Sequence, residues 1–385
     1  MNQAGKEILI VAGEASADRY GARLIRKLQE RVGPAGLSFF GTGGDEIQGA
    51  GARLICHIRD LANIGPQAAL ANLRKYFEVY RRIARACDTK PPAVAVLIDF
   101  PEFNLRLLGR LKRAGTRVIY YVGPQLWAWR RGRVRLIRRH VDRMAVILPF
   151  EVEFYRRHGV KAEFVGHPLL EDFAPERDRD SFLRSTGLDN RRPVLSLLPG
   201  SRRHEVEHIL PTMLRACLQF LESAPAQFLV SVAPTIDDSQ VARIMEKVLG
   251  DLLRPEFRMV KARARDVLAC SDFAFVKSGT STLEAGLVGT PFLITYKVAP
   301  VSWVIGNILI RSRLKGLVNL LVGEEIVPEL LQGRASPEAL AAVAREYLEA
   351  PQKAEAMRSR LARIREMLGA RSASESVASM VADYL

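Results

Sequence analysis

Two short loops of this 385-residue chain have the composition of phosphate-binding loops, and the first covers residues 198–202, LPGSR. It follows an apolar run and precedes a helical pattern. Gly200 lets the backbone approach a ligand, the helix start after Ser201 offers free N–H groups, and Arg202 adds a planar set of donors. These groups suit a diphosphate, although an ordinary strand-to-helix turn with a surface arginine has the same residues.

The second loop, within residues 277–285 (KSGTSTLEA), also comes directly after an apolar run. Its small residues Ser278, Gly279 and Thr280 predict a second anion-binding helix start. Glu284 lies one turn into that helix, where its carboxylate could accept hydrogen bonds from ribose hydroxyls. A first-turn acid favoured by the helix dipole is the simpler interpretation, but the phosphate-type loop before Glu284 favours a ligand.

In the first half of the chain, Asp99 is the residue best suited to proton transfer. It ends the apolar run 94–99, and an acid at the carboxyl end of a parallel strand points into the ligand crevice. We therefore expect Asp99 to act as a general base toward a hydroxyl group, with an N-cap or loop acid as the structural alternative. His167 and His204 are weaker candidates for the base, because a lone histidine is more often structural.

Two further segments contain polar or aromatic residues at predicted strand ends. Residues 13–18 (GEASAD) form a strand–loop–helix junction in which we expect a serine as N-cap. In residues 127–139, six arginines follow Trp127 and Trp129 within ten positions, beginning with Arg130 and Arg131. Such a mixture suits a lipid headgroup interface, a sugar or a phosphate. A solvated helix face is less favoured because no acidic residue stands between Glu102 and Asp142.

The net charge of +15, from 57 Lys and Arg against 42 Asp and Glu, indicates an anionic partner. Nucleic-acid motifs are absent from the sequence, so we expect no nucleic acid as partner and favour an anionic membrane or a phosphorylated substrate. Four scattered cysteines indicate reduced thiols of the cytosol. The one DxD-like string, 178–180, falls in a polar stretch with arginines and is interpreted as solvated linker, so we expect no metal.

Apolar runs alternate with amphipathic stretches along most of the chain, which predicts parallel, doubly wound α/β sheets. In the first half, strands are expected at 7–12, 37–40, 93–99, 117–122, 143–148 and 162–165, and helices at 17–30, 68–87, 105–114, 134–140 and 152–158. In the second half, strands are expected at 194–198, 227–232, 258–260, 273–276 and 292–296, with helices starting near Arg203, Ser239, Asp266 and Thr282.

We accordingly expect four parts: a Rossmann-like domain over 1–170, a linker over 171–192, a second Rossmann-like domain over 193–335, and C-terminal helices over 336–385. The N-terminal apolar run is too short for a signal peptide. The long uncharged runs 61–73 and 298–310 have 13 residues each. They are shorter than the ~20 residues of a membrane span, so they are buried core or interfacial patches.

Eight strings of the sequence, in their order and spacing, resemble the lipid-A-disaccharide synthase family. They are GEASAD at 13–18, DFPEFN at 99–104, PQLWAWR at 124–130, ILPFEVEFYRRHGV at 147–160, FVGHPL at 164–169, LPGSR at 198–202, SGTSTLEA at 278–285 and IVPELLQ at 326–332. Any one of them could arise by chance. Their combination through most of the chain is specific.

The resemblance implies a GT-B glycosyltransferase: two Rossmann-like doubly wound domains facing across a cleft, with a helical C-terminal tail. Members of the family transfer 2,3-diacylglucosamine from a UDP-linked donor to 2,3-diacylglucosamine 1-phosphate with inversion. The product is the β-1,6-linked lipid A disaccharide of Gram-negative bacteria. The resemblance implies no cofactor, and a cytoplasmic protein that is peripheral on the inner face of the inner membrane. Family members can form homodimers, which the helical tail would permit.

Carried over by position, the resemblance gives three groups of site residues. Asp99 and Arg202 would be catalytic. The donor's UDP would contact Gly200, Ser201, Arg202, Ser278, Gly279, Thr280, Glu284, Asn319 and Gln332. The acceptor and membrane side would comprise Glu14, Ser16, Asp18, Asn104, Trp127, Trp129, Arg130 and Arg131, together with the 61–73 run.

The sequence departs from the family pattern at three places. Ala17 replaces a glycine, Val318 replaces a proline, and the acid that usually follows shortly after Gly65 is missing. The missing acid near Gly65 leaves room for a divergent paralogue with another acylated acceptor. A divergent UDP-GlcNAc-type transferase is one alternative. A UDP-GlcNAc 2-epimerase-like enzyme, which shares the architecture, is the other alternative.

Overall fold

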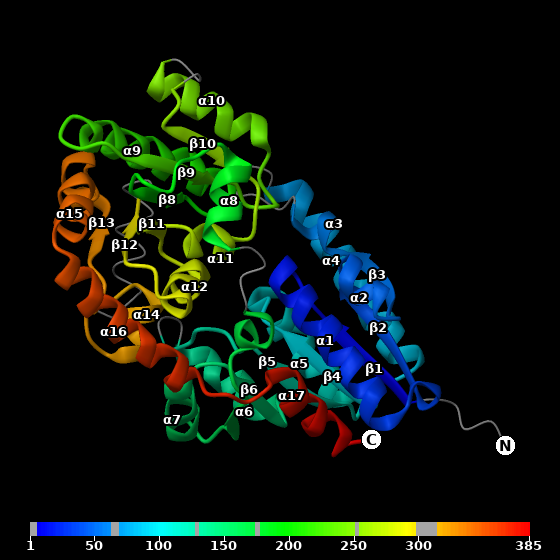
Figure 1. The fold of residues 1–385 in the computed structure, drawn as a ribbon. Helices are drawn as coiled ribbons and strands as arrows, with labels where there is room; N and C mark the ends of the chain where they lie inside the picture. The colour runs from blue at the N-terminus through cyan, green and yellow to red at the C-terminus, as the bar shows by residue number, and fades with distance from the viewer. Residues whose placement is uncertain (1–5, 63–68, 128–130, 174–177, 251–253, 298–313) are drawn as a thin grey trace. The chain divides into compact units, whose positions relative to one another are not determined.

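The computed structural model describes residues 6–62, 69–127, 131–173, 178–250, 254–297 and 314–385 (Figure 1). The chain forms two compact units. Unit 1 comprises Met1–Asp172 and Leu368–Leu385, and unit 2 comprises Phe173–Met367. Each unit is an α/β structure built on a parallel sheet, so the predicted pair of Rossmann-like folds is confirmed.

Unit 1 contains a sheet in which the described strands lie in the order β3-β2-β1-β4-β5-β6-β7, all parallel. The strands are β1 (Lys6–Val11), β2 (Leu37–Gly43), β3 (Arg53–His57), β4 (Val94–Ile98), β5 (Arg117–Tyr121), β6 (Arg143–Val146) and β7 (Ala162–Phe164). The helices are α1 (Ala15–Val32), α2 (Asp45–Gly49), α3 (Ile58–Ala62), α4 (Ala69–Thr89), α5 (Pro101–Arg113), α6 (Val134–His140), α7 (Pro149–Arg157) and α17 (Ala373–Ala382), with the 3-10 turns η1 (Pro34–Gly36), η3 (Arg131–Arg133) and η4 (Pro168–Asp172).

Both faces of the unit 1 sheet are covered, which explains why its strands read as continuous apolar runs. Side chains alternate between the faces, so Ile8 and Ile10 pack with α1 and α17, whereas Leu9 and Val11 pack with α4 and α5. The last helix, α17, lies beside α1 although the two are far apart in sequence (Figure 1).

Unit 2 contains a sheet with the described strands in the order β10-β9-β8-β11-β12-β13, again all parallel. The strands are β8 (Val194–Leu198), β9 (Gln227–Ser231), β10 (Phe257–Val260), β11 (Phe273–Lys277), β12 (Phe292–Tyr296) and β13 (Glu329–Leu331). The helices are α8 (Arg179–Thr186), α9 (Arg203–Leu221), α10 (Asp238–Leu249), α11 (Ala264–Ala269), α12 (Thr280–Val288), α14 (Leu317–Val322), α15 (Pro337–Glu349) and α16 (Pro351–Leu368), with the 3-10 turn η5 (Gln332–Arg334).

Several elements differ from the expectation. The short strands β3 and β13 and the helices α2, α3 and α14 were not predicted. Helix α5 begins at Pro101, four residues before the expected start, because proline suits the first helical position. The expected tail over 336–385 is divided: α15 packs on α9 in unit 2, and α17 packs in unit 1.

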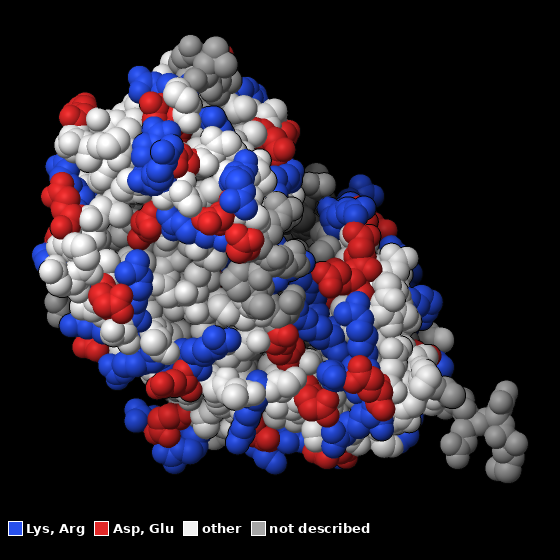
Figure 2. Space-filling model, in the orientation of Figure 1, with Lys and Arg blue, Asp and Glu red and all other residues white. Residues whose placement is uncertain are grey.

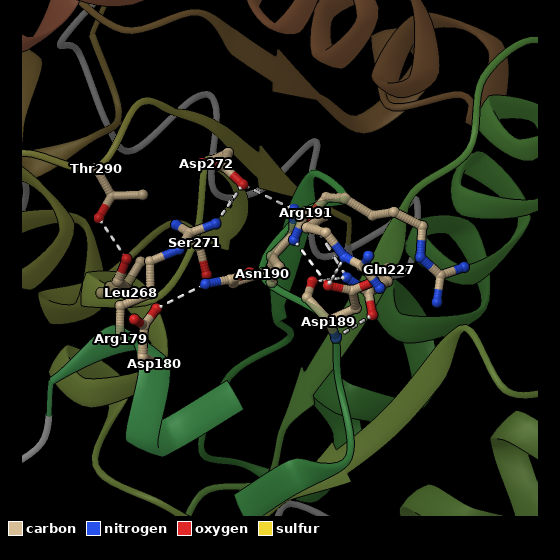
Figure 3. Close-up of polar contacts among 12 residues, drawn as sticks. Arg179, Asp180, Asp189, Asn190, Arg191, Gln227, Leu268, Ser271, Asp272 and Thr290 are labelled. Carbon is tan, nitrogen blue, oxygen red and sulfur yellow. Dashed lines mark hydrogen bonds and ion pairs between the residues drawn. The ribbon is translucent and has the colours of Figure 1, made fainter. Parts of the chain in front are cut away.

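The stretch 171–192, expected as a linker, contains α8 and polar contacts that fix it to the sheet of unit 2 (Figure 3). The Asp178 side chain caps α8 by accepting the Ser181 N–H at 2.9 Å. The Arg179 guanidinium donates to Asp272 Oδ2 at 2.8 Å, and the same oxygen accepts the Val194 N–H at 2.8 Å. These contacts lie where β8 and β11 begin.

Asp180, the other acid of the DxD-like string, accepts a hydrogen bond from Asn190 Nδ2 at 3.0 Å (Figure 3). All three residues of this string therefore have protein partners. Among the residues that the structure describes, no group of three or more His, Cys, Asp or Glu is placed to hold a metal ion.

The basic residues are distributed over many elements rather than gathered in one tail. In the view of Figure 2, acidic side chains lie between basic ones over most of the surface, and basic side chains gather over α1. Arg19 and Arg26 of this helix are exposed, while Arg23 donates to the Pro168 carbonyl at 3.1 Å.

Candidate functional site

The predicted donor residues of unit 2 follow strands that are neighbours in the sheet. Leu198 of β8 lies opposite Val276 of β11, and Tyr296 of β12 lies opposite Leu331 of β13. Since all these strands are parallel, their loops leave the sheet at the same edge. The structure therefore brings the following predicted residues to one edge: Gly200, Ser201, Arg202, Ser278, Gly279, Thr280 and Gln332.

The loop after β8 requires glycine at position 200. Its φ of 118° lies in the region that L side chains avoid, and a Cβ there would be 2.5 Å from Glu205 Oε2. The Ser201 carbonyl accepts the Thr235 hydroxyl at 2.7 Å, which holds the loop from outside. Arg202 is the N-cap of α9, and its side chain is exposed.

The loop after β11 leads into α12, whose N-cap is Gly279. The Ser278 N–H donates to the Thr295 carbonyl at 3.0 Å, and its hydroxyl donates to the Lys315 carbonyl at 3.2 Å. Thr280, the first helical residue, is exposed. Glu284 is half-buried one turn further along α12, and its contact with a ribose remains a prediction.

An ion pair with one buried partner, not predicted from the sequence, joins the two loops. Lys277, the last residue of β11, places its Nζ 2.7 Å from Oε1 of Glu205 in the first turn of α9. Glu205 is 4% exposed. The Lys277 ammonium also lies 5.3 Å from the centroid of the Tyr296 ring. Burial, and then the nearby Glu205 carboxylate, raise the pKa of Tyr296.

Asn319 and Gln332 occupy different surroundings. The fully buried Asn319 donates from Nδ2 to the Val327 carbonyl and to Glu329, and its Oδ1 accepts the N–H groups of Ile326 and Val327. Both ends of this amide are thus used inside the protein, so any effect of Asn319 on a ligand would pass through the loop it holds. Gln332 follows β13 with a φ of 52°, in the left-handed region.

In unit 1, Asp99 directly follows β4 at the carboxyl edge of the sheet. Asp99 and Phe100 both have left-handed backbones, with φ of 48° and 44°. Such conformations cost of order 1–3 kcal/mol each and persist where the surroundings enforce them, often at functional sites. Here the Asp99 carbonyl accepts hydrogen bonds from Asn104 Nδ2 at 2.7 Å and from the Tyr120 hydroxyl at 2.8 Å.

The GEASAD loop follows β1, the neighbour of β4. Gly13 packs against the Phe100 ring so closely that a Cβ would lie 2.4 Å from Phe100 Cγ. The N-cap of α1 is Glu14 rather than the expected serine, since Ser16 lies in the first turn and its hydroxyl donates to Glu14 Oε1 at 3.0 Å. Glu14 is exposed and Ser16 half-buried.

Asp18 is buried and has a clear structural role. Its carboxylate accepts the backbone N–H groups of Gly44, Glu46 and Ile47, at 2.6, 3.2 and 3.1 Å. Asp18 thereby satisfies the first turn of α2, as a capping carboxylate does. Its assignment to the acceptor side remains a prediction.

The arginine-rich segment is described in part. Trp129 and Arg130 lie outside the described residues, and Arg131 begins η3. The Trp127 indole donates to Glu151 Oε1 at 3.2 Å. Glu151 is 2% exposed, its Oε2 accepts the Leu148 N–H at 3.1 Å, and burial raises its pKa to about 7. Glu151 was not predicted from the sequence, although its place three residues after the N-cap Leu148 is a capping signal.

The two histidines considered as bases differ in exposure. His167 is 2% exposed and burial lowers its pKa to about 4, so its imidazole is neutral at physiological pH. His204 is exposed in the first turn of α9.

Comparison with known proteins identifies the family. A model of the lipid-A-disaccharide synthetase family matches residues 8–382. A lipid-A-disaccharide synthase of Geobacter metallireducens is 40% identical over 383 residues, covering 99% of this chain and 97% of its own length. That of Anaeromyxobacter sp. strain K is 42% identical over 376 residues, with 97% and 96% covered.

The chain belongs to the lipid-A-disaccharide synthase family. It is therefore an enzyme of the glycosyltransferase class, as the sequence motifs predicted.

Solved structures agree with this family at the level of the fold. The UDP-GlcNAc 2-epimerase of Neisseria meningitidis, bound to UDP-GlcNAc, has a TM-score of 0.67 at 11% identity, with 98% of this chain and all of that chain covered. A calicheamicin glycosyltransferase has a TM-score of 0.61 at 16% identity, with 100% and 99% covered. The GT-B fold class predicted from the sequence is confirmed.

The hydroxyl of Tyr120 provides a test of the turn at Asp99. We expect Tyr120→Phe to lower kcat roughly tenfold with little change in KM, because one of two donors to the Asp99 carbonyl is lost. Tyr121→Phe is the control, since this buried tyrosine lies next in the strand, on the other face. Equal kinetics for the two variants would show that the Tyr120 hydroxyl does not position Asp99.

The raised pKa of Glu151 predicts a pH-dependent stability. Folding favours the protonated carboxyl, so the stability of the protein should fall as pH rises from about 4.5 to about 7. Glu151→Gln mimics the protonated form. Between pH 5 and pH 8 its free energy of unfolding should therefore fall by on the order of 2 kcal/mol less than that of the wild type. Thermal melting of both proteins across this range measures the effect. Parallel pH curves would contradict it.

Proposed function

We propose that this enzyme transfers 2,3-diacylglucosamine from UDP to the 6-hydroxyl of 2,3-diacylglucosamine 1-phosphate, with inversion at the anomeric carbon. Membership of the family makes lipid A disaccharide formation its activity, with a UDP-sugar donor and a sugar-phosphate acceptor. The observation that supports the donor assignment most strongly is the convergence of two phosphate-type loops at one edge of the unit 2 sheet.

In this proposal unit 2 binds the donor. Arg202 and the N-termini of α9 and α12 face the diphosphate, whose negative charge grows as its bond to the sugar breaks. Gly200 and Gly279 let backbone N–H groups come close to it. Glu284, one turn into α12, accepts hydrogen bonds from ribose hydroxyls, and Gln332 contributes from the end of β13.

Asp99 of unit 1 is the proposed general base. As the acceptor oxygen bonds to the anomeric carbon, the bond from that carbon to the diphosphate oxygen breaks and UDP leaves. The proton of the attacking hydroxyl passes to the Asp99 carboxylate. A single displacement of this kind inverts the anomeric centre, which gives the β linkage. Glu14, Ser16 and Asn104, at the same edge of the unit 1 sheet, are proposed to lie on the acceptor side.

Because its proposed substrates carry acyl chains, we propose that the enzyme acts at the anionic inner face of the inner membrane. The described residues contain no helix with the length and apolarity needed to cross a bilayer. Helix α6 presents the exposed arginines Arg135, Arg138 and Arg139, and Leu136 is 44% exposed. This mixture suits a headgroup surface. The 61–73 run, also proposed to dock there, lies partly outside the described residues, and the 298–310 run lies wholly outside them. The homodimer remains a prediction.

An epimerase-like activity is less favoured. The epimerase neighbour shares 11% of its sequence with this chain and shows the fold alone. The synthases share about 40% over almost the whole length.

The direct test is turnover of UDP-2,3-diacylglucosamine with 2,3-diacylglucosamine 1-phosphate, followed by mass spectrometry. We expect the disaccharide 1-phosphate and UDP, and a 10²- to 10⁴-fold lower kcat for Asp99→Asn, because the base is lost. Asp88→Asn, the same change at an exposed acid in α4, is the matched control.

Two results would contradict the proposal. Near-normal turnover by Asp99→Asn would remove Asp99 from the role of base. Conversion of the donor to an epimer in the absence of acceptor would instead assign the chain an epimerase activity.

A further inference from the structure

The ammonium group of Lys277 lies at the junction of the two phosphate-type loops of unit 2. Its Nζ donates to Glu205 Oε1 at 2.7 Å, and Glu205 belongs to the helix that the first loop begins. On the other side, a Cβ at Gly279 would be 3.5 Å from the same Nζ. Lys277 thus contacts the helix of one loop and lies beside the N-cap glycine of the other.

Lys277 is an unusual residue for its strand. It is the one polar residue of β11, FAFVK, whose other side chains are fully buried. Its own side chain remains 16% exposed, at the edge where the strand ends. An ammonium has three N–H donors, and the Glu205 contact uses one of them.

The charges around Lys277 suit an anionic ligand. Glu205 is buried, and a buried carboxylate without a partner is costly. It would also repel a diphosphate bound above Gly200, whose missing Cβ leaves Glu205 Oε2 close to the loop. Lys277 neutralises the charge of Glu205. The Arg202 guanidinium lies 3.7 Å from the same carboxylate, so the three side chains together carry a net charge of +1.

We propose that Lys277 is a second cationic residue of the donor site, which contacts the diphosphate of the nucleotide and stabilises it as it leaves. This inference rests on the proposed function, because it takes the two loops as the diphosphate site. Glu205 positions the lysine between the loops. A salt bridge with a structural role alone is the competing explanation.

The test compares UDP, which carries the diphosphate, with uridine, which does not. We expect Lys277→Met to lower the affinity for UDP about tenfold, measured by titration calorimetry, because a charge-assisted contact is lost. Uridine, measured by ligand-observed NMR, should bind unchanged. Lys353→Met, the same change at an exposed ion pair in α16, should leave UDP binding unchanged.

Lys277→Met leaves Glu205 buried without its partner and can unfold unit 2, so the double variant Glu205→Gln/Lys277→Met is measured beside it. This variant removes both charges and keeps the shape. We expect it to melt close to the wild type and to bind UDP more weakly than the wild type, because the lysine contact is lost. Its loss should be smaller than that of the single variant, in which the unneutralised Glu205 carboxylate also repels the diphosphate.

Wild-type UDP affinity in the folded double variant would overturn the inference and leave the proposed function intact. An equal loss of UDP and uridine binding would also overturn it, since that result indicates a structural role. If the wild-type protein bound no UDP, the donor assignment and this inference would fail together.

Discussion

Parallel pairing of β8 with β11, in the register that sets Leu198 opposite Val276, is the constraint on which the donor site of unit 2 depends. It makes the two glycine loops leave the sheet side by side and puts two helix N-termini at one edge. A shift of one residue would turn Lys277 to the other face of the sheet. Glu205 would then be buried without its cation, so the ion pair and the strand register stabilise one another.

Unit 1 uses the same geometry to hold a strained turn. Two consecutive residues with left-handed backbones, Asp99 and Phe100, follow β4. Their conformational cost is offset by the hydrogen bonds of Asn104 and Tyr120 to the Asp99 carbonyl, and by the packing of the Phe100 ring on Gly13. The sequence strings at 13–18 and 99–104 therefore pack against each other in the folded protein.

The strongest apolar runs and the loops after them were predictable, because a buried parallel strand leaves a continuous apolar pattern and glycine marks a close approach. β3 (RLICH) was missed because its polar ends interrupt that pattern. Asp18 binds backbone N–H groups 26 to 29 residues away, and the partners of Asn319 lie 7 to 10 residues away. Spacing in the sequence alone does not reveal these contacts. Glu205 and Lys277 are 72 residues apart, so their ion pair can be predicted only when the order of the strands in the sheet is known.

A crystal structure of the protein with bound UDP would show whether unit 2 holds the donor at its two glycine loops. We expect diphosphate density at the carboxyl edge of the unit 2 sheet, within hydrogen-bond distance of Arg202 and of the backbone N–H groups that follow Gly200 and Gly279. Density for the diphosphate elsewhere in unit 2, or in unit 1, with these two loops unoccupied, would contradict it.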